Sequence, residues 1–264
     1  MHRSLARLVC GAILVVAART AAAQTRDTSD TFNWTGAIPA GSWVRVVNLN
    51  GSIDVDAAEG STTQVEGRKE WRHGDPDRVH FKVLKDGSNV TICALWGDDD
   101  SCDAEGYHGH HGDGNNGDVS VRFTIRLPKG VQVAVQTVNG SVDVAGATSG
   151  VEAHTVNGRV DATSSGGAVR AGSVNGSVHA RMAKIPANGD LEYESVNGTV
   201  TVELPASLDA DVELSTVNGA VRTDYPMTVS GRLDPKHIRG TIGKGGLRLR
   251  VKTVNGSVEL QKLG

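Results

Sequence analysis

The residues with the most evident chemistry gather in one polar stretch, residues 97–118. This stretch holds six candidate metal ligands and several glycines, with almost no apolar side chains: His108, His110, His111, Asp98, Asp100 and Asp103. Imidazole and carboxylate groups together suit Zn²⁺, and carboxylates alone suit Ca²⁺. The spacing lacks the alternating aspartates of a calcium loop, and the composition is also typical of a solvated surface loop, which we favour. We therefore predict no cofactor, with Ca or Zn bound in loop 98–113 as the weaker alternative.

A second possibility is acid–base chemistry on a polysaccharide. Glu192 and Glu194 lie two residues apart in an acidic stretch, and Arg248, Arg250 and Lys252 form a basic stretch near the end. Two carboxylates can act as acid and base on a glycosidic bond. Residues two apart on a strand also share its solvent-facing side whatever their role, so this pattern is more typical of a wet sheet face. No nucleophile–base motif or phosphate-binding loop accompanies it, and we predict no catalytic residues.

The first residues predict export. Arg3 and Arg7 precede a short apolar run, and Ala21–Ala23 fit a cleavage site, so residues 1–23 are typical of a secretory signal peptide. An uncleaved N-terminal anchor is the alternative. Cleavage would change the net charge from −3 to about −6, which argues against nucleic acid as a partner. No later apolar stretch is long enough for a transmembrane segment. We expect a periplasmic, surface or extracellular protein.

Export also bears on the cysteines. Cys93 and Cys102 remain after cleavage, and an isolated pair in an oxidising compartment usually forms a disulfide. The alternative is two reduced thiols, one of them buried.

The elements that must position these residues are set by a repeated phrase, [Ser/Thr]-Val-Asn-Gly-X-Val. It begins at Thr137, Thr155, Ser173, Ser195, Thr216 and Thr253, and a looser copy spans residues 48–53. Apolar and polar residues alternate on both sides of each copy, as in half-buried strands. A period of about 18–22 residues marks a repeat architecture. Aromatic residues make up only 4% of the chain, which suits a narrow interior rather than a wide core.

Two topologies fit this pattern. Asn-Gly between alternating strands is a strong hairpin signal and would give an antiparallel meander. A β-solenoid also explains why the same valine precedes every Asn-Gly, because equivalent positions of stacked coils lie about 4.8 Å apart. We favour the solenoid, and expect Val138, Val156, Val174, Val196, Val217 and Val254 to form an interior column. The asparagines are expected to form a structural ladder: Asn139, Asn157, Asn175, Asn197, Asn218 and Asn255. Glycine is expected to follow because the corner needs a positive φ.

The predicted fold is thus all-β, without a substantial helix beyond the signal peptide. Residues 24–31 are expected to be a flexible N-terminus and residues 32–262 a single solenoid domain. Within it, residues 32–127 would supply N-terminal strands and a cap, with the excursion 97–118, and residues 128–262 the regular repeats. The 37-residue gap before the last copy suggests a coil that lost the phrase, with Gly240–Gly243 at its corner.

Three segments resemble one family. Leu-Pro-Lys-Gly-Val at 127–131, Thr-Val-Asn-Gly-Ser-Val-Asp-Val at 137–144 and the ending from Gly240 to Leu260 are similar to the bacterial DUF4097 family, also called candidate adhesins. The resemblance covers roughly residues 32–262. It implies a β-solenoid of short stacked strands in an exported envelope protein, although loop 97–118 departs from the family pattern. The expected function is a non-enzymatic adhesion-like or structural scaffold that binds an envelope protein or a glycan. A polysaccharide-acting enzyme and a metal-binding protein are the alternatives.

Overall fold

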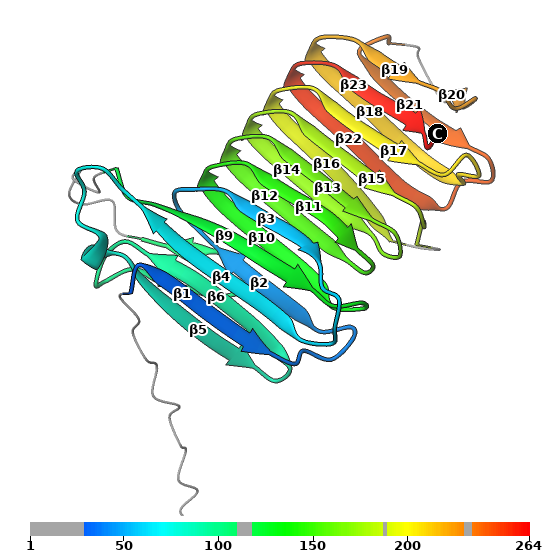
Figure 1. The fold of residues 1–264 in the computed structure, drawn as a ribbon. Helices are drawn as coiled ribbons and strands as arrows, with labels where there is room; N and C mark the ends of the chain where they lie inside the picture. The colour runs from blue at the N-terminus through cyan, green and yellow to red at the C-terminus, as the bar shows by residue number, and fades with distance from the viewer. Residues whose placement is uncertain (1–28, 110–117, 187–188, 230–233) are drawn as a thin grey trace, which may run out of the picture.

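The structure, a computed structural model, is built from β-strands that stack along one axis (Figure 1). It describes residues 29–109, 118–186, 189–229 and 234–264. The predicted signal peptide, residues 1–23, lies outside these ranges. The one helical element among the described residues is a 3₁₀ turn, η1 (Pro76–Arg78). Within the same ranges, no helix has the length and apolarity needed to cross a membrane. The all-β fold class predicted from the sequence is confirmed.

Two long sheets make up the described molecule. The first sheet has 11 strands. In spatial order they are β5 (His80–Asp86), β6 (Asn89–Leu95), β2 (Trp43–Val47), β10 (Gln132–Asn139), β12 (Val151–Asn157), β14 (Val169–Asn175), β16 (Asp190–Asn197), β22 (Leu247–Asn255), β18 (Ala210–Asn218), β21 (His237–Ile242) and β20 (Thr228–Val229).

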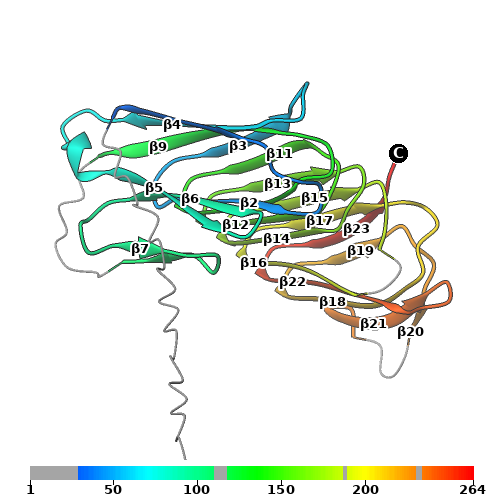
Figure 2. The same cartoon turned by 90° about the horizontal axis from the view of Figure 1, so that it is seen from below.

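The second sheet has 10 strands and lies face to face with the first (Figure 2). In spatial order they are β1 (Thr31–Gly36), β4 (Thr63–Glu70), β9 (Ser120–Leu127), β3 (Ile53–Ala57), β11 (Val142–Ala147), β13 (Val160–Ser164), β15 (Val178–Met182), β17 (Val200–Leu204), β23 (Val258–Lys262) and β19 (Val221–Thr223).

Each repeat contributes one strand to each sheet and is therefore one coil. Successive coils pair in parallel and in register, so that Val133, Val151 and Val169 are neighbours in the first sheet. Parallel pairing excludes the antiparallel meander and confirms the solenoid. The side chains predicted to share a face point between the sheets, where valine, alanine and leucine fill a continuous narrow core. Most outward positions are polar, as expected when each strand has one buried face.

The order of the coils in space departs from their order in the sequence. The last coil, β22–β23, lies between β16–β17 and β18–β19. The chain reaches this slot through β21, which runs antiparallel to β18 on the far side. The proposed extra coil with a corner at Gly240–Gly243 was therefore wrong, since Gly240 lies within β21 and pairs with Val212. The first coil, β2–β3, is likewise enclosed, by β6 and β9 on one side and by β10 and β11 on the other.

Both ends of the stack are closed by strands that break the parallel pattern. At the N-terminal end β1, β4 and β5 run antiparallel to their neighbours. Phe32, Phe81 and Phe123 pack there, with Phe32 and Phe81 stacked at 4.7 Å between ring centroids. At the other end the hydroxyl of Tyr225 donates to the carbonyl oxygen of Leu204 at 2.6 Å. These side chains cover the core, which a solenoid must shield at its ends.

A short hairpin lies outside the two sheets. It consists of β7 (Ser101–Cys102) and β8 (Tyr107–His108), and Figure 2 shows β7 beyond the outer face of the first sheet. A disulfide joins Cys102 to Cys93 of β6. The two half-cystines pack with Val47 and Leu95 in a small cluster apart from the main core. The hairpin carries part of the predicted loop 97–118, and residues 110–117 of that loop lie outside the described residues.

Candidate functional site

The corner between the two sheets is where the repeated phrase lies, and its first residue points inward. The Thr or Ser hydroxyl donates to the carbonyl oxygen of the corner glycine in the preceding coil of the stack. Thr155 reaches Gly140 at 2.8 Å, and Ser173 reaches Gly158 at 2.8 Å. These side chains are buried, and the bonds satisfy hydroxyls that would otherwise be costly to enclose.

The asparagine of the phrase forms a ladder along the outside of the corner. From Asn139 onward, each Nδ2 donates to the Oδ1 of the asparagine in the neighbouring coil at 2.7–2.8 Å. In spatial order the members are Asn50, Asn139, Asn157, Asn175, Asn197, Asn255 and Asn218. The looser upstream copy thus supplies the first member. With their amides bonded to one another, these side chains act as structural elements.

The glycine of the phrase is required for a reason other than the one expected. Of the seven corner glycines, only Gly51 and Gly256 have a positive φ. A Cβ added at Gly158 would overlap the carbonyl oxygen of Gly140, and equivalent overlaps occur at the other corners. The positive-φ explanation was therefore wrong for most coils. Close approach of neighbouring backbones excludes a side chain there.

The valines of the phrase point outward, and the predicted interior column was wrong. Five are exposed, by 37–58%. In spatial order they are Val156, Val174, Val196, Val254 and Val217, and we call them the valine ridge. Val138 continues the row half-buried. The strict alternation that buries Val133 and Val135 also buries Thr137, so it must expose the next residue.

The basic stretch near the C-terminus is paired within the protein. Arg250 of β22 lies 3.2 Å from Glu192 of β16 and 3.4 Å from Glu213 of β18. Hydrogen bonds to these two carboxylates raise the pKa of Arg250. The pKa of Glu213 is lowered, first by its hydrogen bond to Arg239 and also by Arg250. Glu192, the candidate catalytic carboxylate, is therefore part of an ion-pair network that joins three strands.

An acidic row on the outer face of the second sheet was missed. Asp54, Asp143 and Asp161 are register neighbours on β3, β11 and β13. Burial raises the pKa of Asp143, and the charges of Asp161 and Asp54 raise it further. The sequence does contain a signal for this row, because in three coils an aspartate directly follows the last residue of the phrase. Among the described residues no group of three or more side chains is placed to hold a metal ion.

His179 ends this acidic row. Its Nε2 lies 2.7 Å from Glu203 of β17 and its Nδ1 lies 3.3 Å from Asp161 of β13. Burial lowers the pKa of His179, but hydrogen bonds to the two carboxylates outweigh it, so that the pKa is raised. The imidazole thus links three successive coils.

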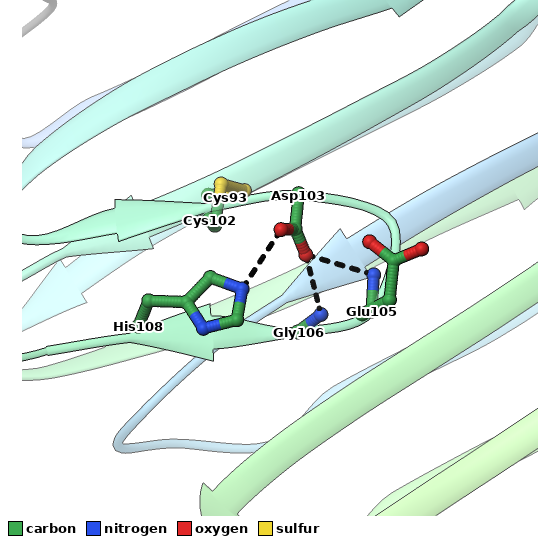
Figure 3. The surroundings of a disulfide bond; sticks show 6 residues. All are labelled: Cys93, Cys102, Asp103, Glu105, Gly106 and His108. Carbon is green, nitrogen blue, oxygen red and sulfur yellow. Dashed lines mark hydrogen bonds and ion pairs between the residues drawn. A yellow bond between two sulfur atoms is a disulfide. The ribbon is translucent and has the colours of Figure 1, made fainter.

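The candidate metal ligands are only partly brought together. His108 Nε2 lies 2.8 Å from Asp103, whose carboxylate also accepts hydrogen bonds from the amides of Glu105 and Gly106 (Figure 3). These contacts, led by the bond to His108, lower the pKa of Asp103. Asp100 instead accepts a short hydrogen bond from the hydroxyl of Tyr107. His110 and His111 lie outside the described residues, so the metal hypothesis stays a prediction.

Comparison with known proteins finds one family and several solved structures to which this chain is similar. The family described as Toastrack DUF4097 matches residues 50–261. No curated protein sequence matches the chain. Two similar solved structures are a candidate cell adhesion protein from Clostridium sporogenes and a candidate adhesin from Bacteroides fragilis. The first is 13% identical with a TM-score of 0.49, covering 88% of this chain and 100% of the other. The second is 11% identical with a TM-score of 0.28, covering 87% and 96%.

Proposed function

The chain belongs to the Toastrack DUF4097 family, and we propose that it is an exported, non-enzymatic scaffold of the bacterial cell envelope. In this proposal the valine ridge binds a protein partner, which makes the molecule an adhesion-like module. The sequence supports export through residues 1–23, whose pattern is typical of a signal peptide. The partner is a protein with a complementary apolar surface.

One observation carries the proposal. The valine ridge is a continuous row of exposed apolar side chains on neighbouring strands, about 4.8 Å apart. Scattered exposed valines are ordinary, but contiguous exposed apolar surface is typical of an interaction site. The ridge is also rigid, because the asparagine ladder and the buried hydroxyls fix the corner on both sides of it. A rigid surface loses little conformational freedom on binding.

The ion pairs on the charged face favour the valine ridge, and not the basic stretch, as the binding surface. Arg250 already lies between two carboxylates, and Arg248 lies 3.3 Å from Asp190. A partner that used these arginines would first have to break contacts within the solenoid. The basic stretch is therefore a weaker candidate for the binding surface than the valine ridge.

The test is binding of the labelled protein to isolated cell envelopes. The ridge variant carries Val174→Ser and Val196→Ser, and the matched control carries Val229→Ser, at an exposed valine of β20 away from the ridge. We expect the wild-type protein and the control to bind, and the ridge variant to lose binding. Protease treatment of the envelopes is expected to abolish binding. Loss after glycan digestion instead would identify a glycan partner, and unchanged binding of the ridge variant would refute the proposal.

The metal-binding alternative has one observation in its favour, the contact between His108 and Asp103. Calorimetry with Zn²⁺ or Ca²⁺ tests it directly. Tight binding that disappears when His108, His110 and His111 are replaced by alanine would support a metal site. Binding only in the millimolar range would exclude it.

A further inference from the structure

The repeated phrase carries a chemical liability that the fold controls. In an Asn-Gly sequence the amide nitrogen of glycine can attack the side-chain carbonyl carbon, Cγ, of asparagine. A bond forms between this nitrogen and Cγ, the bond from Cγ to Nδ2 breaks, and ammonia leaves with the displaced proton. Water then opens the resulting succinimide to aspartate or isoaspartate. Glycine permits this reaction best because it has no side chain to hinder the attack.

We propose that Asn218 is a site of spontaneous deamidation and that the rest of the ladder is protected. The phrase provides an internal comparison, since six ladder members share the same local sequence, Val-Asn-Gly. Any difference in their rates within the folded protein must therefore come from the structure around each corner.

Two contacts protect the inner corners, although in the described part of the chain the corner at Gly176 has only the second. First, the main-chain amide of glycine donates to the main-chain carbonyl oxygen of asparagine in the next coil. Gly158 donates to Asn175 at 3.1 Å, and Gly256 donates to Asn218 at 3.0 Å. An amide held in this way is less available for attack. Second, each inner asparagine side chain is bonded on both sides. Asn157, for example, donates to Asn139 and accepts from Asn175, each at 2.8 Å.

Asn218 lacks both contacts because β19 is the edge strand of the second sheet, so no further corner follows this one in the described part of the ladder. Its Nδ2 donates to Asn255 at 2.8 Å, but no further ladder member donates to its Oδ1. No hydrogen bond from the Gly219 amide to another backbone group is found among the described residues. Gly219 is also exposed, whereas the other corner glycines are half-buried. In the described part of the second sheet β19 pairs with β23 alone, and a strand at the edge of a sheet opens more readily than an inner one.

Asn175 provides an intermediate case. The amide of Gly176 also makes no backbone hydrogen bond among the described residues. The side chain of Asn175 is nevertheless held from both sides, at 2.8 Å by Asn157 and at 2.7 Å by Asn197. We therefore expect Asn175 to react more slowly than Asn218.

The product of deamidation would alter the β18–β19 coil. A carboxylate at position 218 has no Nδ2 to donate to Asn255, so the final ladder bond is lost. Isoaspartate also adds a carbon to the main chain between β18 and β19. The in-register pairing of β19 with β23 could not then be kept without local distortion. Ageing of the protein should consequently begin at this end of the stack.

The experiment is peptide mapping by mass spectrometry of the full-length protein held in mildly alkaline buffer. The mass gain that accompanies conversion of an amide to a carboxyl group is followed at every ladder asparagine, and isoaspartate is confirmed by enzymatic methyl labelling. We expect Asn218 to convert at least roughly tenfold faster than Asn139, Asn157, Asn197 and Asn255, the factor expected when protective hydrogen bonds must open first. The map must separate Asn116 and Asn188, which also precede glycine.

The same protein unfolded in urea is the control. There the six Val-Asn-Gly sites should convert at similar rates, which would show that the fold causes the difference. Conversion of an inner asparagine in the folded protein as fast as that of Asn218 would overturn the proposal. The proposal would also be overturned if Asn218 converted as slowly as the inner asparagines in the folded protein and became faster only on unfolding.

Discussion

Replacing Gly158 by alanine tests why glycine is fixed at the corner. Gly158 does not have a positive φ, so its backbone conformation is open to alanine. Where such a conformation is accessible, glycine to alanine usually stabilises a protein by about 0.4–1 kcal/mol. If glycine were needed at this corner only for its backbone conformation, this substitution should therefore be harmless or stabilising.

The structure predicts the opposite result. The new Cβ would overlap the carbonyl oxygen of Gly140 and lie 3.0 Å from the amide nitrogen of Ser141. The same carbonyl oxygen accepts the Thr155 hydroxyl, and Asn157 donates to Asn139 beside it. Overpacking costs about 1–3 kcal/mol, and strain on two hydrogen bonds adds about 1 kcal/mol each. We expect a loss of roughly 3–5 kcal/mol in the free energy of unfolding.

Thermal melting followed by circular dichroism measures this loss. For a domain of this size, about 2–4 °C is lost per kcal/mol, so the melting temperature should fall by roughly 6–20 °C. Gly60→Ala is the control, because Gly60 also lacks a positive φ and a Cβ there meets nothing within 4 Å. Its melting temperature should equal that of the wild-type protein or exceed it by up to about 4 °C. A Gly158→Ala protein that melts like the control would refute close backbone approach as the reason for glycine.

Three further predictions concern the burial of the strand residues and the ion pairs on the outer faces of the sheets. Val174→Asp should leave the fold intact in circular dichroism, since Val174 is 39% exposed, whereas Ala171→Asp, at 0% exposure, should unfold the domain. For His179, whose folded-state pKa is raised above 6.5, the stabilisation should be fully present below pH 6.5 and disappear as the pH rises through the folded value. A pH series of melting temperatures should show this loss for the wild-type protein and not for His179→Gln. Arg250→Glu should lower the melting temperature and recover part of the loss in high salt, whereas Arg250→Gln should lower it less.

Most of the repeat geometry could be predicted from the sequence because it depends on local alternation. Val133 and Val135 point inward as expected, and the apolar residues after each Asn-Gly do the same. The error lay in breaking this alternation at the phrase. The valine that recurs in every copy of the phrase is assigned to the core, although continued alternation buries Thr137 and turns Val138 outward. The buried hydroxyl is stable only because a glycine carbonyl of the neighbouring coil lies within reach, which no single coil reveals.

The candidate binding surface was missed for the same reason. With the valines assigned to the interior, the sequence leaves only asparagines at the outer corner, and the charged faces become the surfaces where function is expected. The acidic row of Asp54, Asp143 and Asp161 could have been found, because each aspartate follows the phrase at the same distance. The contact of His179 with Glu203 depends on two coils of unequal length and could not.

The spatial order of the coils β16–β17, β22–β23 and β18–β19 depends on residues outside the repeated phrase. Both β18–β19 and β22–β23 have Thr-Val-Asn-Gly at the corner between their two strands, so either could extend the ladders from Asn197. If the coils followed the sequence, β18 would lie beside β16 and place Glu213 next to Glu192, since both share a register with Arg250. Like charges directly opposite on neighbouring strands are destabilising. Inserting the basic strand β22 between the two acidic strands replaces that repulsion with ion pairs to Arg250 on both sides. The repeated phrase therefore makes the coils stack, and the outward charges that vary between coils select the order in which they do so.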